Sequence, residues 1–142
     1  MKVIFLDADG VINYATSGPF DPTCLENLSK ITKATGAKIV LISSWRMAYN
    51  ENGTVRHKWA AHFEHNLQLF GMELYALAPY LNDRRSAEVD KYLKENDVSH
   101  YVIIDDSDYN YSQKHPKNWV QPDAMHSGLT EELAEKCINI LT

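Results

Sequence analysis

The sequence predicts an α/β domain with a mainly parallel sheet, and three observations indicate it. Continuous apolar runs of four or five residues recur along the chain, as in strands that are buried on both faces. Segments with apolar residues at helical spacing separate these runs. The 142 residues are 44% hydrophobic and 23% charged, which is ordinary for a globular protein of one domain. We therefore expect a single domain over residues 1–142, in which strands alternate with helices.

The first strand and the first helix carry the clearest signals. Val3–Leu6 form the first apolar run. Asp21 then offers an N-cap, and Pro22 suits the first helical turn, where its missing N–H group costs no hydrogen bond. Apolar residues at helical spacing follow, and Gly36 marks the expected end of the helix.

The middle of the chain predicts one more strand and two more helices. A second apolar run indicates a buried strand over residues 38–42. Aromatic and aliphatic residues at helical spacing predict a helix from about residue 55 to 70. The interval between Val89 and Leu93 predicts another helix over residues 85–95.

The last part of the chain predicts two strands and a closing helix. Residues 101–104 are a third apolar run, whereas the polar and aromatic stretch 108–116 indicates a loop. A short strand is expected over residues 118–121. Thr130 is the expected N-cap of a helix that extends to Leu141.

Composition limits the class of protein further. The 14 Lys and Arg residues against 19 Asp and Glu residues give a net charge of −5, which argues against extended coating of nucleic acid. No apolar run approaches the length of a membrane span or of a signal-peptide core, so we expect no membrane partner. Cys24 and Cys137 lie far apart with no CxxC spacing, and we expect two buried thiols in a cytoplasmic protein.

Acidic and hydroxyl side chains gather after three of the predicted strands. They are Asp7 and Asp9 after the first, Ser43 and Ser44 after the second, and Asp105 and Asp106 after the third. Ligands of open α/β sheets bind beyond the carboxyl ends of the strands, so these groups should converge. Carboxylates in one place repel each other unless a cation lies among them, and oxygen ligands suit Mg²⁺.

Each of these groups taken alone has a purely structural interpretation. The DxDG segment at Asp7 is compatible with a turn, and the Asp105-Asp106 pair with a solvated loop. An EF-hand loop is excluded, because its spacing would place Phe5 and Thr16 at ligand positions. The combination is the informative feature, since all three groups end buried strands.

Four motifs therefore follow one another in a fixed order. They are Asp7-Ala8-Asp9-Gly10 after Val3–Leu6, Ser43 after Ile39–Ile42, an arginine at a helix start, and Asp105-Asp106 after Val102–Ile104. This combination resembles the haloacid dehalogenase (HAD) superfamily of phosphohydrolases. The segments Ser43-Ser44-Trp45-Arg46 and Gly128-Leu129-Thr130 further resemble the small HAD domains of Swiss Army Knife RNA-repair-like proteins.

The resemblance implies a three-layer α/β/α sandwich with a Rossmann-like, HAD-type sheet, and a phosphatase mechanism. Asp7 would be the nucleophile that forms an aspartyl-phosphate. Asp9 would protonate the leaving oxygen and then activate water. Mg²⁺ would be held by Asp7, by the backbone carbonyl of Asp9 and by Asp106, with Asp105 in support.

The resemblance also implies two phosphate-binding groups. Ser43 would donate to the phosphoryl oxygens, and Ser44 would replace it if the strand is shifted by one residue. Arg85 would neutralise developing charge, since it precedes the first apolar residue of its helix by one turn. Arg84 remains the alternative for this third motif.

The spacing of the motifs leaves no room for a substantial cap domain. Only residues 13–20 separate the first motif from its helix, and residues 45–83 are expected to hold one helix and loops. An open site admits bulky substrates, so the expected partner is a phosphorylated nucleic-acid end, a nucleotide or a small phosphomonoester.

Residues 45–83 also contain basic, histidine and aromatic side chains. They are Arg46, Arg56, His57, Lys58, Trp59, His62 and His65. One interpretation is a patch that guides a nucleic-acid end; the other, which we favour, is a helix with Trp59, Phe63 and Leu67 toward the core and charges outward. Tyr109 and Tyr111 either stack on a base or anchor their loop.

Two functions other than that of a phosphatase are compared with the same motifs. A non-catalytic phosphate-binding or regulatory module on the same fold stays open, although no acidic motif residue is missing. A receiver domain of a phosphorelay would place its acidic pair near the first strand, whereas Asp105-Asp106 ends a late one.

Overall fold

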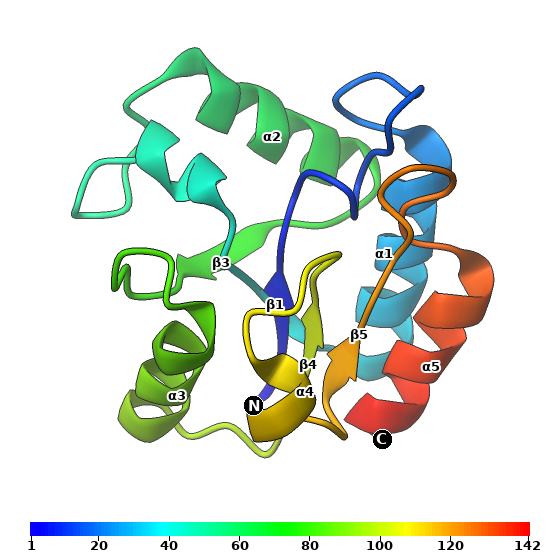
Figure 1. Ribbon diagram of the computed structural model, residues 1–142. Helices are drawn as coiled ribbons and strands as arrows, with labels where there is room; N and C mark the ends of the chain where they lie inside the picture. Colours follow the sequence, from blue (N-terminus) through cyan, green and yellow to red (C-terminus); the bar gives the residue numbers. More distant parts are fainter.

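Five parallel strands form one sheet in the computed structural model, which describes residues 1–142 (Figure 1). The strands are β1 (Lys2–Leu6), β2 (Lys38–Leu41), β3 (Leu74–Leu77), β4 (His100–Ile104) and β5 (Trp119–Val120). Their order across the sheet is β3-β2-β1-β4-β5, so the chain crosses from one half of the sheet to the other after β3. The predicted α/β class with a parallel sheet is confirmed.

Helices cover both faces of the sheet. They are α1 (Pro22–Thr35), α2 (Lys58–Leu69), α3 (Arg85–Glu95), α4 (Tyr111–Lys114) and α5 (Glu131–Leu141), with the 3₁₀ helix η1 (Ser44–Ala48) after β2. Side chains of α1, α2 and α5 pack in one hydrophobic cluster with Ile4 and Leu6 of β1. Val3 and Phe5, which point the opposite way, pack with α3 and α4. The result is the predicted three-layer α/β/α sandwich.

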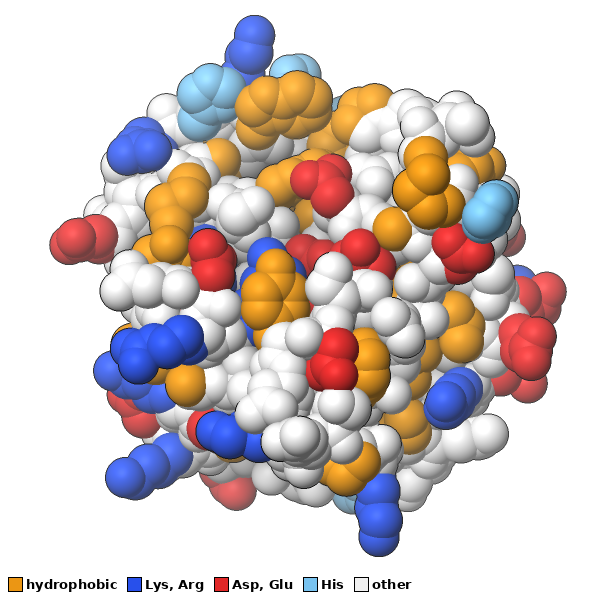
Figure 2. Space-filling view, viewed as in Figure 1, with side chains coloured by type: hydrophobic (Ala, Val, Ile, Leu, Met, Phe, Trp, Pro, Cys, Tyr) orange, Lys and Arg blue, Asp and Glu red, His pale blue; other side chains and the backbone are white.

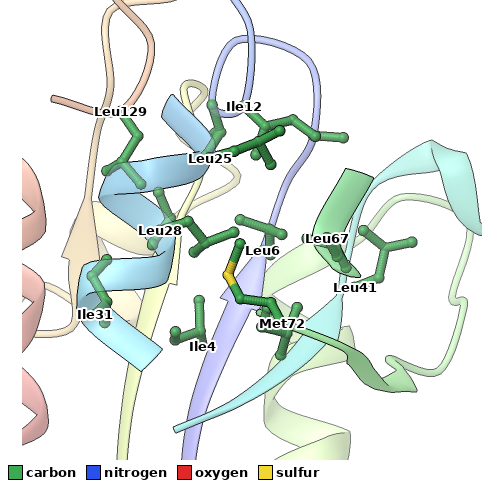
Figure 3. Packing of buried hydrophobic residues seen from close by; sticks show 14 of the residues in the cluster. Ile4, Leu6, Ile12, Leu25, Leu28, Ile31, Leu41, Leu67, Met72 and Leu129 are labelled. Carbon is green, nitrogen blue, oxygen red and sulfur yellow. The ribbon is translucent and has the colours of Figure 1, made fainter. Parts of the chain in front are cut away.

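The larger cluster shows why these helices are amphipathic. Figure 3 shows the apolar side chains of α1 directed toward Ile4 and Leu6 of the central strand. Leu28 of α1 and Leu67 of α2 are fully buried there. Truncation of one such leucine to alanine typically costs about 2–5 kcal/mol, so this face contributes much of the stability.

The predicted helix ends are set by capping residues. The Asp21 side chain accepts a hydrogen bond from the Cys24 N–H, and Gly36 adopts the left-handed conformation (φ 71°) after α1. Thr130 accepts a hydrogen bond from the Leu133 N–H at the start of α5. These predictions are confirmed.

Two expectations for the connecting segments were wrong. The stretch 108–116 is not only a loop, because Tyr111 is buried and anchors the one-turn helix α4. Residues 45–83 hold η1 and the edge strand β3 in addition to α2. The edge strand was missed although Leu74–Leu77 is a continuous apolar run, because a run of four residues rich in Leu and Ala does not distinguish a strand from a helix segment.

Residues 45–83 nevertheless form no cap. Phe63, Leu67 and Met72 belong to the same hydrophobic cluster as β1 and α1, and Trp45 packs against it. This segment is therefore part of the core and leaves the carboxyl edge of the sheet uncovered by a separate domain, as predicted. No helix has the length and apolar character needed to cross a membrane.

The register of the strands brings the predicted site residues to one edge. Leu6 of β1 pairs with Leu41 of β2 and with Ile104 of β4. The backbone N–H of Asp7 donates to the Ile104 carbonyl, and that of Asp105 donates to β5. The residues that follow these strands consequently leave the sheet together.

Candidate active site

Three carboxylates meet beyond the carboxyl ends of β1 and β4. Asp7, Asp105 and Asp106 each offer an oxygen within 4.8 Å of the others. Asp7 and Asp105 are buried, whereas Asp106 is half-buried. In Figure 2, acidic side chains gather in the middle of the face that carries this edge of the sheet. The predicted convergence of the first and fourth motifs is present.

One guanidinium group joins this acidic cluster. Nη1 of Arg85, the first residue of α3, lies 3.1 Å from Oδ1 of Asp7 and 3.0 Å from Oδ2 of Asp105. The guanidinium also stacks over the ring of Tyr109, at 4.3 Å from its centroid. Arg84 is exposed and donates instead to the Leu81 carbonyl. The structure thus brings Arg85, and not Arg84, to the carboxylates.

The electrostatics of the cluster disfavour full ionisation without a cation. Burial and the charge of Asp105, against the opposing effect of Arg85, together raise the pKa of Asp7 to about 9. Burial also raises the pKa of Asp105, although Arg85 and hydrogen bonds oppose this. One arginine does not balance three carboxylates, so the site is suited to a bound metal ion.

The two members of the acidic pair have different surroundings. Asp105 accepts hydrogen bonds from Arg85, from the Tyr111 hydroxyl at 2.9 Å and from the Ser107 N–H at 3.1 Å. Its oxygens are therefore largely engaged by the protein. The Asp106 carboxylate has fewer protein partners and lies directly against Gly10.

Gly10 of the DxDG segment is required by this contact. Its φ is +85°, a conformation that favours glycine. A Cβ at this position would lie 2.7 Å from Cγ of Asp106 and 2.8 Å from Cβ of Ala124. A larger residue would displace the Asp106 carboxylate.

The Asp9 side chain lies outside the acidic cluster. Its carboxylate is exposed and accepts hydrogen bonds from Nε1 of Trp45 at 3.1 Å and from Nδ2 of Asn13 at 3.0 Å. Oδ1 of Asn13 in turn accepts from the Gly10 N–H. The predicted metal contact of Asp9 uses its backbone carbonyl. The orientation of the Asp9 side chain does not test that contact, which stays a prediction.

The two serines after β2 have different environments. Ser43 is buried, and its Oγ accepts a hydrogen bond from the Trp45 N–H at 3.0 Å. No acceptor for its hydroxyl hydrogen is present in the protein, so this donor is free for a ligand. Ser44 is exposed and lies with Asp9 on the wall of an adjoining cavity.

The structure corrects two expectations about residues 45–83. Trp59 does not face the core, because 44% of it is exposed. Arg46 is not part of an exposed basic patch, because it is buried and forms an ion pair with Glu88 of α3 at 2.8 Å. Phe63 and Leu67 do face the core, as expected.

Several contacts of the site were not anticipated. The hydrogen bond of Trp45 to Asp9 depends on the 3₁₀ turn of η1. Tyr111 was considered a loop aromatic, yet its hydroxyl reaches Asp105. Hydrophobic periodicity does not predict where the side chains of Trp45 and Tyr111 point. The only signal in the sequence is that both aromatic residues lie close to motif residues along the chain.

Comparisons with known proteins found one family model and one solved structure that match the chain. A family model described as the HAD domain in Swiss Army Knife RNA repair proteins matches residues 3–134. A solved HAD superfamily (subfamily III A) hydrolase from Legionella pneumophila matches with a TM-score of 0.52 and 18% identity, over 99% of this chain and 82% of that one. At this identity the structural match supports the fold alone. No curated protein matches the chain.

Proposed function

We propose, because the chain belongs to the family of HAD domains found in Swiss Army Knife RNA repair proteins, that it is a Mg²⁺-dependent phosphomonoester hydrolase. Membership in this family supports a phosphohydrolase-type function. The observation that carries the more specific proposal is the meeting of Asp7 with Asp105, Asp106 and Arg85 at one edge of the sheet.

The donor set fits a magnesium ion. The candidate ligands offer only oxygen atoms, and Mg²⁺ prefers such ligands together with substrate phosphate. Asp7, Asp106 and the Asp9 carbonyl would hold the ion, and Asp105 would support the site through Arg85 and Tyr111. When bound, the ion would lower the pKa of Asp7 and offset the charge of the phosphoryl oxygens.

The chemistry proceeds in two steps on the protein's own residues. An Asp7 carboxylate oxygen attacks phosphorus, the bond to the leaving oxygen breaks, and Asp9 gives that oxygen a proton. A water then attacks the aspartyl-phosphate, Asp9 takes its proton, and phosphate leaves with Asp7 restored. The hydrogen bonds from Trp45 and Asn13 fix the Asp9 carboxylate for both proton transfers.

Ser43, or Ser44 in its place, and Arg85 would bind the phosphoryl group. Ser43 has a hydroxyl hydrogen without an acceptor, and Ser44 is the alternative donor from the same turn. The Arg85 guanidinium contacts the proposed nucleophile, so it would stabilise charge as the phosphoryl group is transferred. The open edge of the sheet suits a nucleic-acid end, a nucleotide or a small phosphomonoester as substrate, without extended coating of nucleic acid.

The test is phosphate release from p-nitrophenyl phosphate, with and without Mg²⁺, by wild type and Asp7→Asn. Wild type should turn over only with the metal, and Asp7→Asn should be inactive. Asp97→Asn is the matched control, because it makes the same change at an exposed carboxylate before the amino end of β4. Activity of Asp7→Asn equal to that of wild type would overturn the nucleophile assignment.

A substrate panel would then define the class. It compares 3′- and 5′-phosphorylated oligonucleotides, nucleotides and sugar phosphates, each with Mg²⁺. Failure on every nucleic-acid end would remove that substrate class and leave a small-molecule phosphatase. A Mg²⁺-bound protein inert on the whole panel would instead support a non-catalytic phosphate-binding module.

A further inference from the structure

A cavity of about 470 Å³ adjoins Asp9, and none of Asp7, Asp105 and Asp106 lines it. Its lining includes Asp9, Ser44, Trp45, Met47, Arg56 and Trp59. This volume is within the range of small-molecule sites, about 300–1,000 Å³. Met47, Arg56 and Trp59 of this lining have no role in the proposed steps at the phosphoryl group.

Two indole rings form much of its apolar wall. The centroids of Trp45 and Trp59 lie 6.2 Å apart, and their planes meet at 39°. Phe20 contacts both rings, and the buried Phe63 packs edge-on behind Trp45. Trp59 is 44% exposed and lines the cavity. A flat ring of a ligand can therefore stack on the exposed part of the Trp59 ring.

Two cationic side chains without a carboxylate partner lie on or next to the cavity, although the protein is acidic overall. Arg56 lines the cavity and donates to the Met47 carbonyl, but no carboxylate lies within 4.0 Å of its guanidinium. Lys58, at the start of α2, likewise has no carboxylate partner. Figure 2 shows Lys, Arg and His side chains beside hydrophobic ones at the top of the view, where Figure 1 places α2.

Trp45 connects this cavity to the proposed chemistry. Its ring lines the cavity, and its Nε1 donates to Oδ2 of Asp9. Asp9 must face the leaving oxygen in order to protonate it, so the remainder of the leaving group lies beside Asp9. The cavity is the recess found there.

We propose that this cavity is the leaving-group site, and that it selects a flat aromatic ring accompanied by a second anionic group. A nucleotide has this chemistry, either free or at the end of an oligonucleotide. The base stacks on Trp45 and Trp59, and Arg56 contacts the additional phosphate. Trp45 also acts as a positioning residue for Asp9. This inference rests on the proposed function, which it makes more specific.

The first test compares kcat/KM for a nucleoside monophosphate and for ribose 5-phosphate. Trp59→Ala should lower the ratio of the two values by about tenfold or more, mainly through KM for the nucleotide, because stacking on its ring is lost. Trp59→Phe should restore much of the ratio. Tyr75→Ala removes an exposed aromatic ring outside this cavity and should leave the ratio unchanged. An unchanged ratio in Trp59→Ala overturns the proposal.

The second test separates positioning from stacking. Trp45→Phe keeps an aromatic ring but loses the donor to Asp9. Its kcat should fall more on a nucleoside monophosphate, whose alkoxide needs a proton, than on p-nitrophenyl phosphate, whose leaving group needs none. Asp9→Asn should show the same pattern. Equal losses of kcat on the two substrates would refute the positioning role.

A third measurement distinguishes the source of the second phosphate and does not require turnover. Quenching of tryptophan fluorescence in Asp7→Asn gives Kd for a nucleoside monophosphate, a nucleoside bisphosphate and a terminally phosphorylated pentanucleotide. Arg56→Gln in that background should weaken the latter two selectively, and tighter binding of the pentanucleotide would identify nucleic-acid ends. Quenching without hydrolysis by wild type would refute only the proposed function, whereas hydrolysis without quenching would refute only the leaving-group site.

Discussion

Replacement of Glu88 by glutamine should destabilise the fold far more than the same change at an exposed ion pair. Glu88 is fully buried, and its Oε1 accepts from Nη2 of Arg46 at 2.8 Å. Its Oε2 accepts from the Leu81 N–H at 2.6 Å. The Arg46 side chain is only 4% exposed, so its charge has no access to water as a substitute partner.

The expected loss follows from what remains after the substitution. A glutamine at position 88 has one carbonyl oxygen, so it can accept a hydrogen bond either from Arg46 or from the Leu81 N–H. Its amide N–H₂ group then faces the other of these two donors. The Arg46 charge stays buried without a counter-charge, which typically costs about 3–5 kcal/mol. Arg46→Met should cost at least as much, because Arg46 also donates to the carbonyls of Ser43, Ala78 and Pro79.

Urea unfolding followed by tryptophan fluorescence measures this loss. Glu131→Gln is the matched control, since Glu131 pairs with Lys30 at 3.1 Å on the surface and should contribute at most about 1 kcal/mol. A loss below about 1 kcal/mol for Glu88→Gln would refute the argument from burial. Reduced phosphate release should accompany the loss, because Glu88 lies one turn after Arg85 in α3.

Three further changes test the acidic cluster. Gly10→Ala should weaken Mg²⁺ binding at least about tenfold in calorimetric titration by displacing Asp106, whereas Gly53→Ala, with a similar φ of +84° and open space around it, should not. Gly53→Ala should lose about 1–2 kcal/mol of stability through its φ, and Gly10→Ala should lose more because its Cβ also clashes with Asp106 and Ala124; equal Mg²⁺ affinities would contradict the steric argument. Tyr111→Phe removes a donor to a buried carboxylate and should lower the free energy of unfolding by about 1.5–3 kcal/mol in urea; no change would mean that this bond contributes nothing. Burial raises the pKa of Asp7 from 3.8 to about 9, so the metal-free folded protein keeps a proton that the unfolded chain releases. Stability in EDTA should therefore fall as the pH rises from 5 to 9, and Asp7→Asn should flatten this slope; a parallel slope in that variant would contradict the shift.

The central strands and the helix ends could be predicted because local rules determine them. A strand buried on both faces needs a continuous apolar run, and a helix end needs a capping group such as Asp21 or Gly36. The meeting of Asp7 with Asp105 followed from the same reasoning, because parallel strands end at one edge. The edge strand Leu74–Leu77 is also an apolar run, but its Leu and Ala residues are equally compatible with a helix, and so short a run does not separate the two.

The side chains around η1 could not be predicted in this way. Arg46 occupies a five-residue 3₁₀ helix, where no periodic pattern separates a buried position from an exposed one. Only the tertiary contact with Glu88 determines that this arginine is internal. Trp59 follows the helical period of Phe63 but sits at the second position of α2, where the helix start extends beyond the apolar cluster. Hydrophobic spacing predicts which face of a helix is apolar, but not how far the core extends along it.

The placement of charge would allow a protein with a net charge of −5 to receive the proposed phosphorylated substrate. Surface carboxylates more than about 10 Å away are largely screened at 0.1 M salt, so the groups within the site dominate. There, three carboxylates and one guanidinium leave two negative charges when all are ionised, and one divalent cation balances these two. Without the cation Asp7 keeps its proton, and a phosphate would meet carboxylates with only one guanidinium to offset them; with the cation, the phosphate would meet a neutral cluster that keeps the directed donors of Arg85 and Ser43. Phosphate binding should consequently require prior metal binding, and inorganic phosphate should bind measurably to the wild-type protein only when Mg²⁺ is present.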